Sequence, residues 1–211
     1  MNSNTILFGL YPYMAAVVCF VGCWIRYDRE QYSWKAGSSQ VLRTKGMRIA
    51  SNTFHVGILF VLAGHFVGLL MPESIYHHVI STPNKQLLAM VSGGLFGALC
   101  FVGLTMLIVR RFTDERVKAS SSFSDNLVLV LLYIQLILGL STIYASSHHM
   151  DGSVMVMLAN WAQSIVLFRP MEAAASIASV SLVYKLHVFL GITLFLIFPF
   201  TRLVHIISGL A

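Results

Sequence analysis

The sequence contains few charged residues. Of its 211 residues only 10% are charged and 57% are hydrophobic, and the mean hydropathy is +0.77. Soluble domains carry about 25% charged residues, so this composition excludes an ordinary soluble domain. Acidic residues are the scarcest class, with eight Asp and Glu against fourteen Lys and Arg, which gives a net charge of +6.

Cysteine is also sparse, and its spacing excludes two kinds of protein. The three cysteines are Cys19, Cys23 and Cys100, and all lie in apolar stretches. Two cysteines one helical turn apart on the same helix form neither a disulfide framework nor a metal motif. No CxxCH sequence occurs, which excludes a covalently attached c-type haem. We therefore expect three buried, inert thiols.

Long apolar runs make up most of the chain. Five runs have about the 20 residues needed to cross a hydrocarbon core, and they lie near 5–25, 49–71, 86–109, 127–147 and 182–208. They predict an all-α, polytopic membrane protein, with residues 1–211 forming a single bundle of five transmembrane helices. No basic residue precedes the first run and no small-residue cleavage site follows it, so we expect a retained helix rather than a signal peptide. In the long 150–181 connection, MEAAASIA predicts a short interfacial helix.

Basic residues are concentrated in two of the four connections. The 26–48 connection holds Arg26, Arg29, Lys35, Arg43, Lys45 and Arg48, and the 110–125 connection holds Arg110, Arg111, Arg116 and Lys118. The 72–85 and 146–181 connections contribute only Lys85 and Arg169. The positive-inside rule then predicts that the N-terminus is outside and the C-terminus cytoplasmic. Because topology explains the net charge, we expect no nucleic-acid partner.

Eight histidines fall into two groups. His77, His78, His148 and His149 lie where spans leave the membrane, and we expect them to be surface residues. The other four, His55, His65, His187 and His205, lie inside the second and fifth spans. An ionisable side chain at membrane depth is costly and usually functional.

Depth predicts how the four intramembrane histidines pair. In a straight helix, residues 187 and 205 are five whole turns apart and share a face, while residues 55 and 65 are about 80° apart. At 1.5 Å per residue, His55 and His65 lie about 9 and 24 Å from the cytoplasmic entry. His187 lies about 8 Å from the outer entry and His205 about 35 Å along. In a membrane about 30–35 Å thick, His65 matches His187 in depth and His55 matches His205, whereas the opposite pairing would mismatch by about a dozen ångströms or more.

A pair of facing imidazoles indicates a metal, since histidine is the commonest metal ligand. Zinc requires four ligands, and no cysteine or carboxylate lies at either depth. Haem iron needs only two axial ligands from the protein, so the sequence predicts two b-type haems, one near each face. A lipid-soluble quinol is the natural electron donor, and the acceptor must be a partner protein. A transporter or proton channel that uses the histidines as relays is the alternative.

Glycines in the spans are compatible with a macrocycle between helices. They are Gly57, Gly64, Gly68, Gly93, Gly94, Gly97 and Gly191. Ordinary packing of small residues between helices explains them equally well.

Several stretches carry a family resemblance over essentially the whole chain. They are LYPYMAAVVCFVGCWIRYDREQYSWKAGSSQ (10–40), KGMRIASNTFHVGIL (45–59), HHMDGS (148–153), WAQSIVLF (161–168) and LHVFLGITLFLIFPFTRLVHI (186–206). The chain resembles the gamma subunit of bacterial respiratory nitrate reductase, a cytochrome b-type membrane anchor. The resemblance implies a multi-pass protein of the bacterial inner membrane, in contact with its lipids, with five helices that hold two haems b. The resemblance further implies that menaquinol or ubiquinol donates electrons. They would pass inward to an iron–sulfur (beta) subunit and a molybdopterin-containing catalytic (alpha) subunit, which reduces nitrate in the cytoplasm.

The resemblance also implies roles for individual residues. His65 and His187 would bind the distal haem, and His55 and His205 the proximal haem. Lys85 corresponds to the lysine of the quinol site, beside Gly64 in depth, where a cation would stabilise negative charge on the quinone oxygen. The alternative is that Lys85 only extends to the membrane surface from a helix end.

Two features depart from the family pattern. Family members usually continue past the fifth helix into a cytoplasmic tail, whereas this sequence ends at Ala211, as a short variant or a truncated form would. The 169–181 stretch (RPMEAAASIASVS) also differs. Related membrane cytochromes of sulfite-reduction and heterodisulfide-type complexes remain an alternative at this stage.

Overall fold

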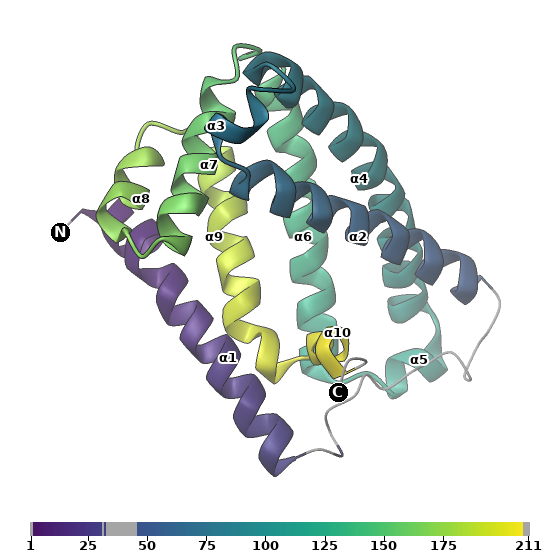
Figure 1. Cartoon of the computed structure of the whole chain (residues 1–211). Coiled ribbons are helices and arrows are strands. Elements are labelled where there is room, and N and C mark those ends of the chain that lie inside the picture. The colour runs from purple at the N-terminus through teal and green to yellow at the C-terminus, as the bar shows by residue number, and fades with distance from the viewer. Residues whose placement is uncertain (1, 31, 33–45, 209–211) are drawn as a thin grey trace.

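Five long helices form an up-and-down bundle (Figure 1). The computed structural model describes residues 2–30, 32 and 46–208, and these ranges contain helices, turns and loops but no strand. Five helices are long and apolar enough to cross a membrane. They are a π-helical segment η1 (Thr5–Leu10) continuing into α1 (Tyr11–Arg29), then α2 (Met47–Leu70), α4 (Thr82–Thr113), α6 (Phe123–Ser146), and α9 (Leu182–Ile197) with η3 (Phe198–Phe200). The all-α class and the five spans are thereby confirmed, while Lys35, Arg43 and Lys45 lie outside the described residues.

Short helices cover the two ends of this bundle. At one end, called the α7 end below, lie α3 (Glu73–Tyr76), α7 (Ser153–Val166) and α8 (Pro170–Ser176) (Figure 1). At the other, the α5 end, lie α5 (Glu115–Ala119), η4 (Arg202–Val204) and α10 (His205–Ser208). Every membrane-spanning helix therefore runs between these two ends.

Helices α2 and α4 pack with their backbones in close contact. A Cβ atom at Gly103 would clash with the Phe54 backbone and lie 2.9 Å from the Ala50 carbonyl oxygen. A Cβ atom at Gly57 would lie 2.8 Å from Cys100 Cα. Only residues without a side chain allow this approach, which is how small residues join helices inside membranes. Gly57 therefore serves helix packing, the simpler of the two readings of the glycines.

The connection between α6 and α9 contains two helices, of which the sequence predicted only the second. The predicted MEAAASIA helix is α8, although it packs on η1 rather than lying free at the interface, and a Cβ atom at Gly9 would come 2.7 Å from Pro170 O. The unpredicted helix α7 is fixed by side chains on both sides. Trp161 Nε1 donates to Phe8 O at 2.9 Å, and Gln163 Nε2 donates to Leu69 O at 3.1 Å.

The prediction of one straight helix from 182 to 208 was wrong. Helix α9 ends at Ile197, and the chain turns through η3, η4 and α10 before residue 208. Pro199 causes the break because proline has no N–H to donate and disfavours the helical conformation in the residue before it. His187 and His205 consequently lie on different helices rather than five turns apart on one.

Arginine and threonine side chains stabilise this break. The Arg26 guanidinium on α1 donates to Pro199 O at 2.6 Å and to Thr201 O at 3.2 Å. Thr201 is extended, with φ −124° and ψ 176°, and its Oγ1 accepts from the Leu203 N–H at 3.3 Å. The Pro199 and Thr201 carbonyls, which the interrupted helix leaves without helical partners, are thus paired, and the last segment returns toward α2.

Candidate functional site

The four intramembrane histidines lie in two pairs. The ring centroids of His65 and His187 are 6.0 Å apart with their planes at 44°, and those of His55 and His205 are 6.4 Å apart at 79°. These are the two pairs expected from depth, although the argument for His205 assumed a straight helix. Helix α2 contributes one ring to each pair. Their role as iron ligands stays a prediction.

Three of the four rings are oriented by their own backbone. In each, Nδ1–H donates to a carbonyl oxygen three or four residues earlier, so the ring lone pair is on Nε2. This second-shell bond fixes the tautomer in metal-binding histidines. The bonds are His55 to Ser51 O at 2.7 Å, His65 to Val61 O at 2.8 Å, and His205 to Arg202 O at 2.6 Å.

Helix α6 positions the fourth ring, His187. Gln135 Nε2 donates to the His187 carbonyl oxygen at 3.1 Å, and a Cβ atom at Gly139 would lie 3.0 Å from His187 Cε1. Within the described ranges, His187 Nδ1 and Gln135 Oε1 are both buried without a hydrogen-bond partner. Sequence reasoning missed Gln135 and Gly139 on α6. A lone glutamine followed four positions later by glycine in an apolar run was a signal that could have revealed them.

The donor set fits a haem iron at each pair. A metal–nitrogen bond of about 2.0 Å on each side, plus about 1.1 Å from nitrogen to ring centre, places two opposed imidazole centroids about 6 Å apart. Both observed distances agree with this value. In the described part of the chain no three His, Cys, Asp or Glu residues meet to hold a metal, so each level offers two protein ligands. Gly64 and Gly68 have no atom within 4 Å of a Cβ position, so neither obstructs a flat group beside α2.

Lys85 lies in the first turn of α4, not in the preceding loop as predicted, because α4 begins at Thr82. The side chain is only 8% exposed, and Nζ lies 3.7 Å from the centroid of the Tyr76 ring. Nζ is buried and has no hydrogen-bond partner among the described residues. A lysine that merely extends to the membrane surface would place Nζ in water, so the geometry argues against that alternative.

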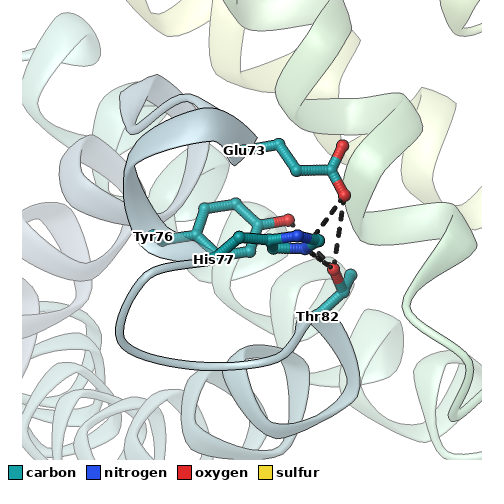
Figure 2. A network of polar contacts seen from close by, with 4 residues as sticks. All are labelled: Glu73, Tyr76, His77 and Thr82. Atoms are coloured by element: carbon teal, nitrogen blue, oxygen red, sulfur yellow. Dashed lines mark hydrogen bonds and ion pairs between the residues drawn. The ribbon is translucent and has the colours of Figure 1, made fainter.

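Figure 2 shows a polar network of Glu73, Tyr76, His77 and Thr82. The Tyr76 ring of this network contacts Lys85. The Tyr76 hydroxyl lies 3.2 Å from Thr82 Oγ1, which lies 2.8 Å from His77 Nε2 and donates to Glu73 Oε1 at 3.4 Å. His77 Nε2 also lies 3.1 Å from Glu73 Oε1. The sequence analysis treated His77 only as a surface residue. Its exposure is as expected, and His78, His148 and His149 are exposed too.

Charge is distributed unequally between the two ends. The α7 end carries Lys85, Arg169 and Lys185. The described basic residues at the α5 end are Arg26, Arg29, Arg48, Arg110, Arg111, Arg116, Lys118 and Arg202. The three cysteines are free, buried thiols, as predicted.

The fold and the paired rings define a multi-pass, all-helical membrane protein with two levels of opposed imidazoles. The chain belongs to the nitrate reductase gamma subunit family, whose sequence model matches residues 4–210. It is 48% identical over 205 residues to the respiratory nitrate reductase 1 gamma chain of Escherichia coli strain K12, covering 97% of this chain and 91% of that one. It is 35% identical over 207 residues to the nitrate reductase gamma chain of Bacillus subtilis strain 168, covering 98% and 92%.

A third relative contains a similar region within a longer protein. The nitrate reductase-like protein NarX of Mycobacterium tuberculosis (strain H37Rv) is 32% identical over 205 residues, which cover 94% of this chain and 30% of NarX. The family resemblance seen in the sequence is thereby confirmed, and the chain is a membrane subunit of a respiratory nitrate reductase.

Proposed function

We propose that this subunit oxidises quinol at the α7 end and delivers the electrons to the α5 end through two haems b. The observation that carries the proposal is the pair of imidazole separations, 6.0 and 6.4 Å. His65 and His187 would hold the distal haem, and His55 and His205 the proximal haem. A haem b held by either pair would supply reversible one-electron transfer.

The protein's own contribution is to orient the imidazoles. Carbonyl oxygens of the same helix accept the Nδ1 protons of His55 and His65, so in both rings Nε2 is the nitrogen left to bind a metal. Gly139 leaves room for the His187 ring against α6. Each ligand is thereby ready to bind iron without a carboxylate in the membrane.

The quinol site is placed at Lys85. Its buried Nζ has no hydrogen-bond acceptor among the described residues, so a quinol oxygen would supply one. A buried donor directed at an oxygen that gains negative charge stabilises that charge strongly. Gly64 lies beside His65 with open space at its Cβ position, and it leaves that side of α2 open to a flat ring.

The direction of electron transfer follows from the distribution of charge. The basic α5 end faces the cytoplasm under the positive-inside rule, which places the N-terminus and the quinol site outside. Electrons would leave from the His55–His205 level to an iron–sulfur subunit and a molybdopterin catalytic subunit docked on the cytoplasmic side. Membership of the nitrate reductase gamma family supports both partners. The subunit itself reduces no nitrate.

Replacing Lys85 tests the function. We expect Lys85→Ala to retain both haems and normal reduction by dithionite, but to slow haem reduction by a menaquinol analogue by about 10²-fold, as loss of one electrostatic donor does. Stopped-flow absorbance of the haems measures the rate. Arg169→Ala is the matched control, since Arg169 is a cation at the same end that only forms an exposed ion pair with Glu172 at 3.4 Å. Equal, wild-type rates in both variants would contradict the proposed site.

A further inference from the structure

The network of Glu73, Tyr76, His77 and Thr82 connects a buried region to solvent (Figure 2). Tyr76 is 5% exposed, and its ring face contacts the Lys85 ammonium. At the other end the side chains of His77 and Glu73 are 49% and 51% exposed. Thr82 Oγ1 lies between them, within 3.4 Å of all three polar groups. Burial therefore decreases along the network, from the proposed quinol site to the water at the α7 end.

The chemistry of these groups suits proton transfer. A hydroxyl both donates and accepts a hydrogen bond, so Tyr76 and Thr82 can each receive a proton on one side and release one on the other. Imidazole and carboxylate are side chains that accept and release protons in general acid–base transfer. In this network the two hydroxyls lie on the buried side, and the imidazole and the carboxylate lie on the exposed side.

We propose that this network is the path by which protons leave the quinol. The inference rests on the proposed function. One quinol becomes one quinone, losing two electrons to the electron acceptor of the proposed function and two protons to this path. For each proton, Tyr76 Oη receives it as its own proton passes to Thr82 Oγ1, and the Thr82 proton passes to His77 Nε2 or Glu73 Oε1. Water at the α7 end then takes it. No electron moves along these groups.

Thr82 is the residue whose loss would interrupt both exits. His77→Ala or Glu73→Gln alone leaves the other acceptor within reach of Thr82 Oγ1. Thr82→Val replaces the hydroxyl with a methyl group of similar size and keeps the methyl group Cγ2, which packs against Gly152 at the start of α7. Thr82→Ser keeps the hydroxyl and provides the conservative rescue. Thr113→Val, at the other end of α4, is a matched control in which only an exposed bond to Val109 O is lost.

The experiment uses the whole nitrate reductase complex in liposomes. Stopped-flow haem reduction by a menaquinol analogue is recorded in H₂O and D₂O, together with proton release to an external pH dye. Thr82→Val should bind both haems and react normally with dithionite. Its quinol-driven reduction and proton release should be slower by about 10²-fold, the lower end of a proton acceptor's contribution. Its solvent isotope effect should be larger than that of wild type.

The outcomes separate this path from the proposed function. Thr82→Ser should match wild type because it keeps a hydroxyl at position 82. Thr113→Val should also match wild type because it does not change position 82. Thr82→Val with a wild-type rate and isotope effect would overturn the path and leave the quinol site at Lys85 intact. A wild-type complex that menaquinol does not reduce would overturn the proposed function and the path with it.

Discussion

Three of the imidazoles pair Nδ1 with a backbone carbonyl oxygen. A helix carbonyl has two lone pairs, and one of them accepts the Nδ1–H of the histidine a turn later. The unpaired charge of a carboxylate at this depth would cost several kcal/mol. Each of these three rings is thus oriented by a carbonyl oxygen of its own chain, so the ligand roles depend on single residues.

Single histidine substitutions should therefore remove one haem at a time. We expect His65→Ala and His187→Ala to lose the same haem, and His55→Ala and His205→Ala to lose the other, because each iron would lose one of its two protein ligands. Reduced-minus-oxidised spectra with haem quantitation measure this. His78→Ala, an exposed histidine at the α7 end, should keep both haems. Loss of different haems in the His65 and His187 variants would refute the pairing.

The site was only partly predictable from the sequence. Histidines in an apolar run are visible because hydrocarbon solvates them poorly, and residue counting placed them in pairs. Gln135 and the groups around Tyr76 escaped notice for a different reason. Their significance lies in contacts between helices and within a folded loop, which no periodicity in the sequence encodes.

At the scale of elements, the contact between α2 and α4 determines where the His55 ring lies. Phe54 is the residue before His55, and its backbone lies against Gly103. Any side chain at position 103 must push α2 away from α4 near the His55–His205 level. Overpacking of this kind costs about 1–3 kcal/mol.

Gly103→Ala should therefore lower haem content at the His55–His205 level and largely spare the other haem. Gly93→Ala is the control on the same helix, because its Cβ position has only Ile143 Cδ1 within 4 Å, at 3.9 Å. Haem quantitation and thermal stability of the purified variants measure both effects. Equal haem loss from the two levels in Gly103→Ala would show that this contact does not act locally.

Element prediction succeeded where hydrophobicity alone decides the structure. The five spans follow from apolar length, since backbone polar groups in lipid must pair within a helix. Helix α7 has 14 residues, too few to cross the membrane, so hydropathy did not distinguish it from a loop. The hydropathy of the fifth span continues through Pro199 and hid the end of α9 at Ile197. Proline chemistry, considered at that position, would have revealed it.

At the scale of the whole molecule, the proposed direction of electron flow depends on which end faces the cytoplasm. Cysteine labelling can establish this, because Cys19, Cys23 and Cys100 are buried and contribute little background. Ser147 and Ser120 are exposed helix C-caps, at the α7 and α5 ends respectively. In intact spheroplasts, a membrane-impermeant maleimide should label Ser147→Cys and leave Ser120→Cys unlabelled until the membrane is permeabilised. The reverse pattern would invert the topology.

Helix α2 contributes a ring to both imidazole pairs, and this has a consequence for the spacing of the two levels. His55 and His65 are ten residues apart on one uninterrupted helix, so their attachment points differ in height by about 15 Å. Under the proposed function, the distance between the two histidine pairs that an electron would cross is therefore determined by the number of α2 residues between His55 and His65. The turn at Pro199 redirects the chain that carries His205 without altering that interval. Helix α2 would thus set the spacing of the two proposed haem sites, and movement of loops or partner subunits around it would leave that spacing unchanged.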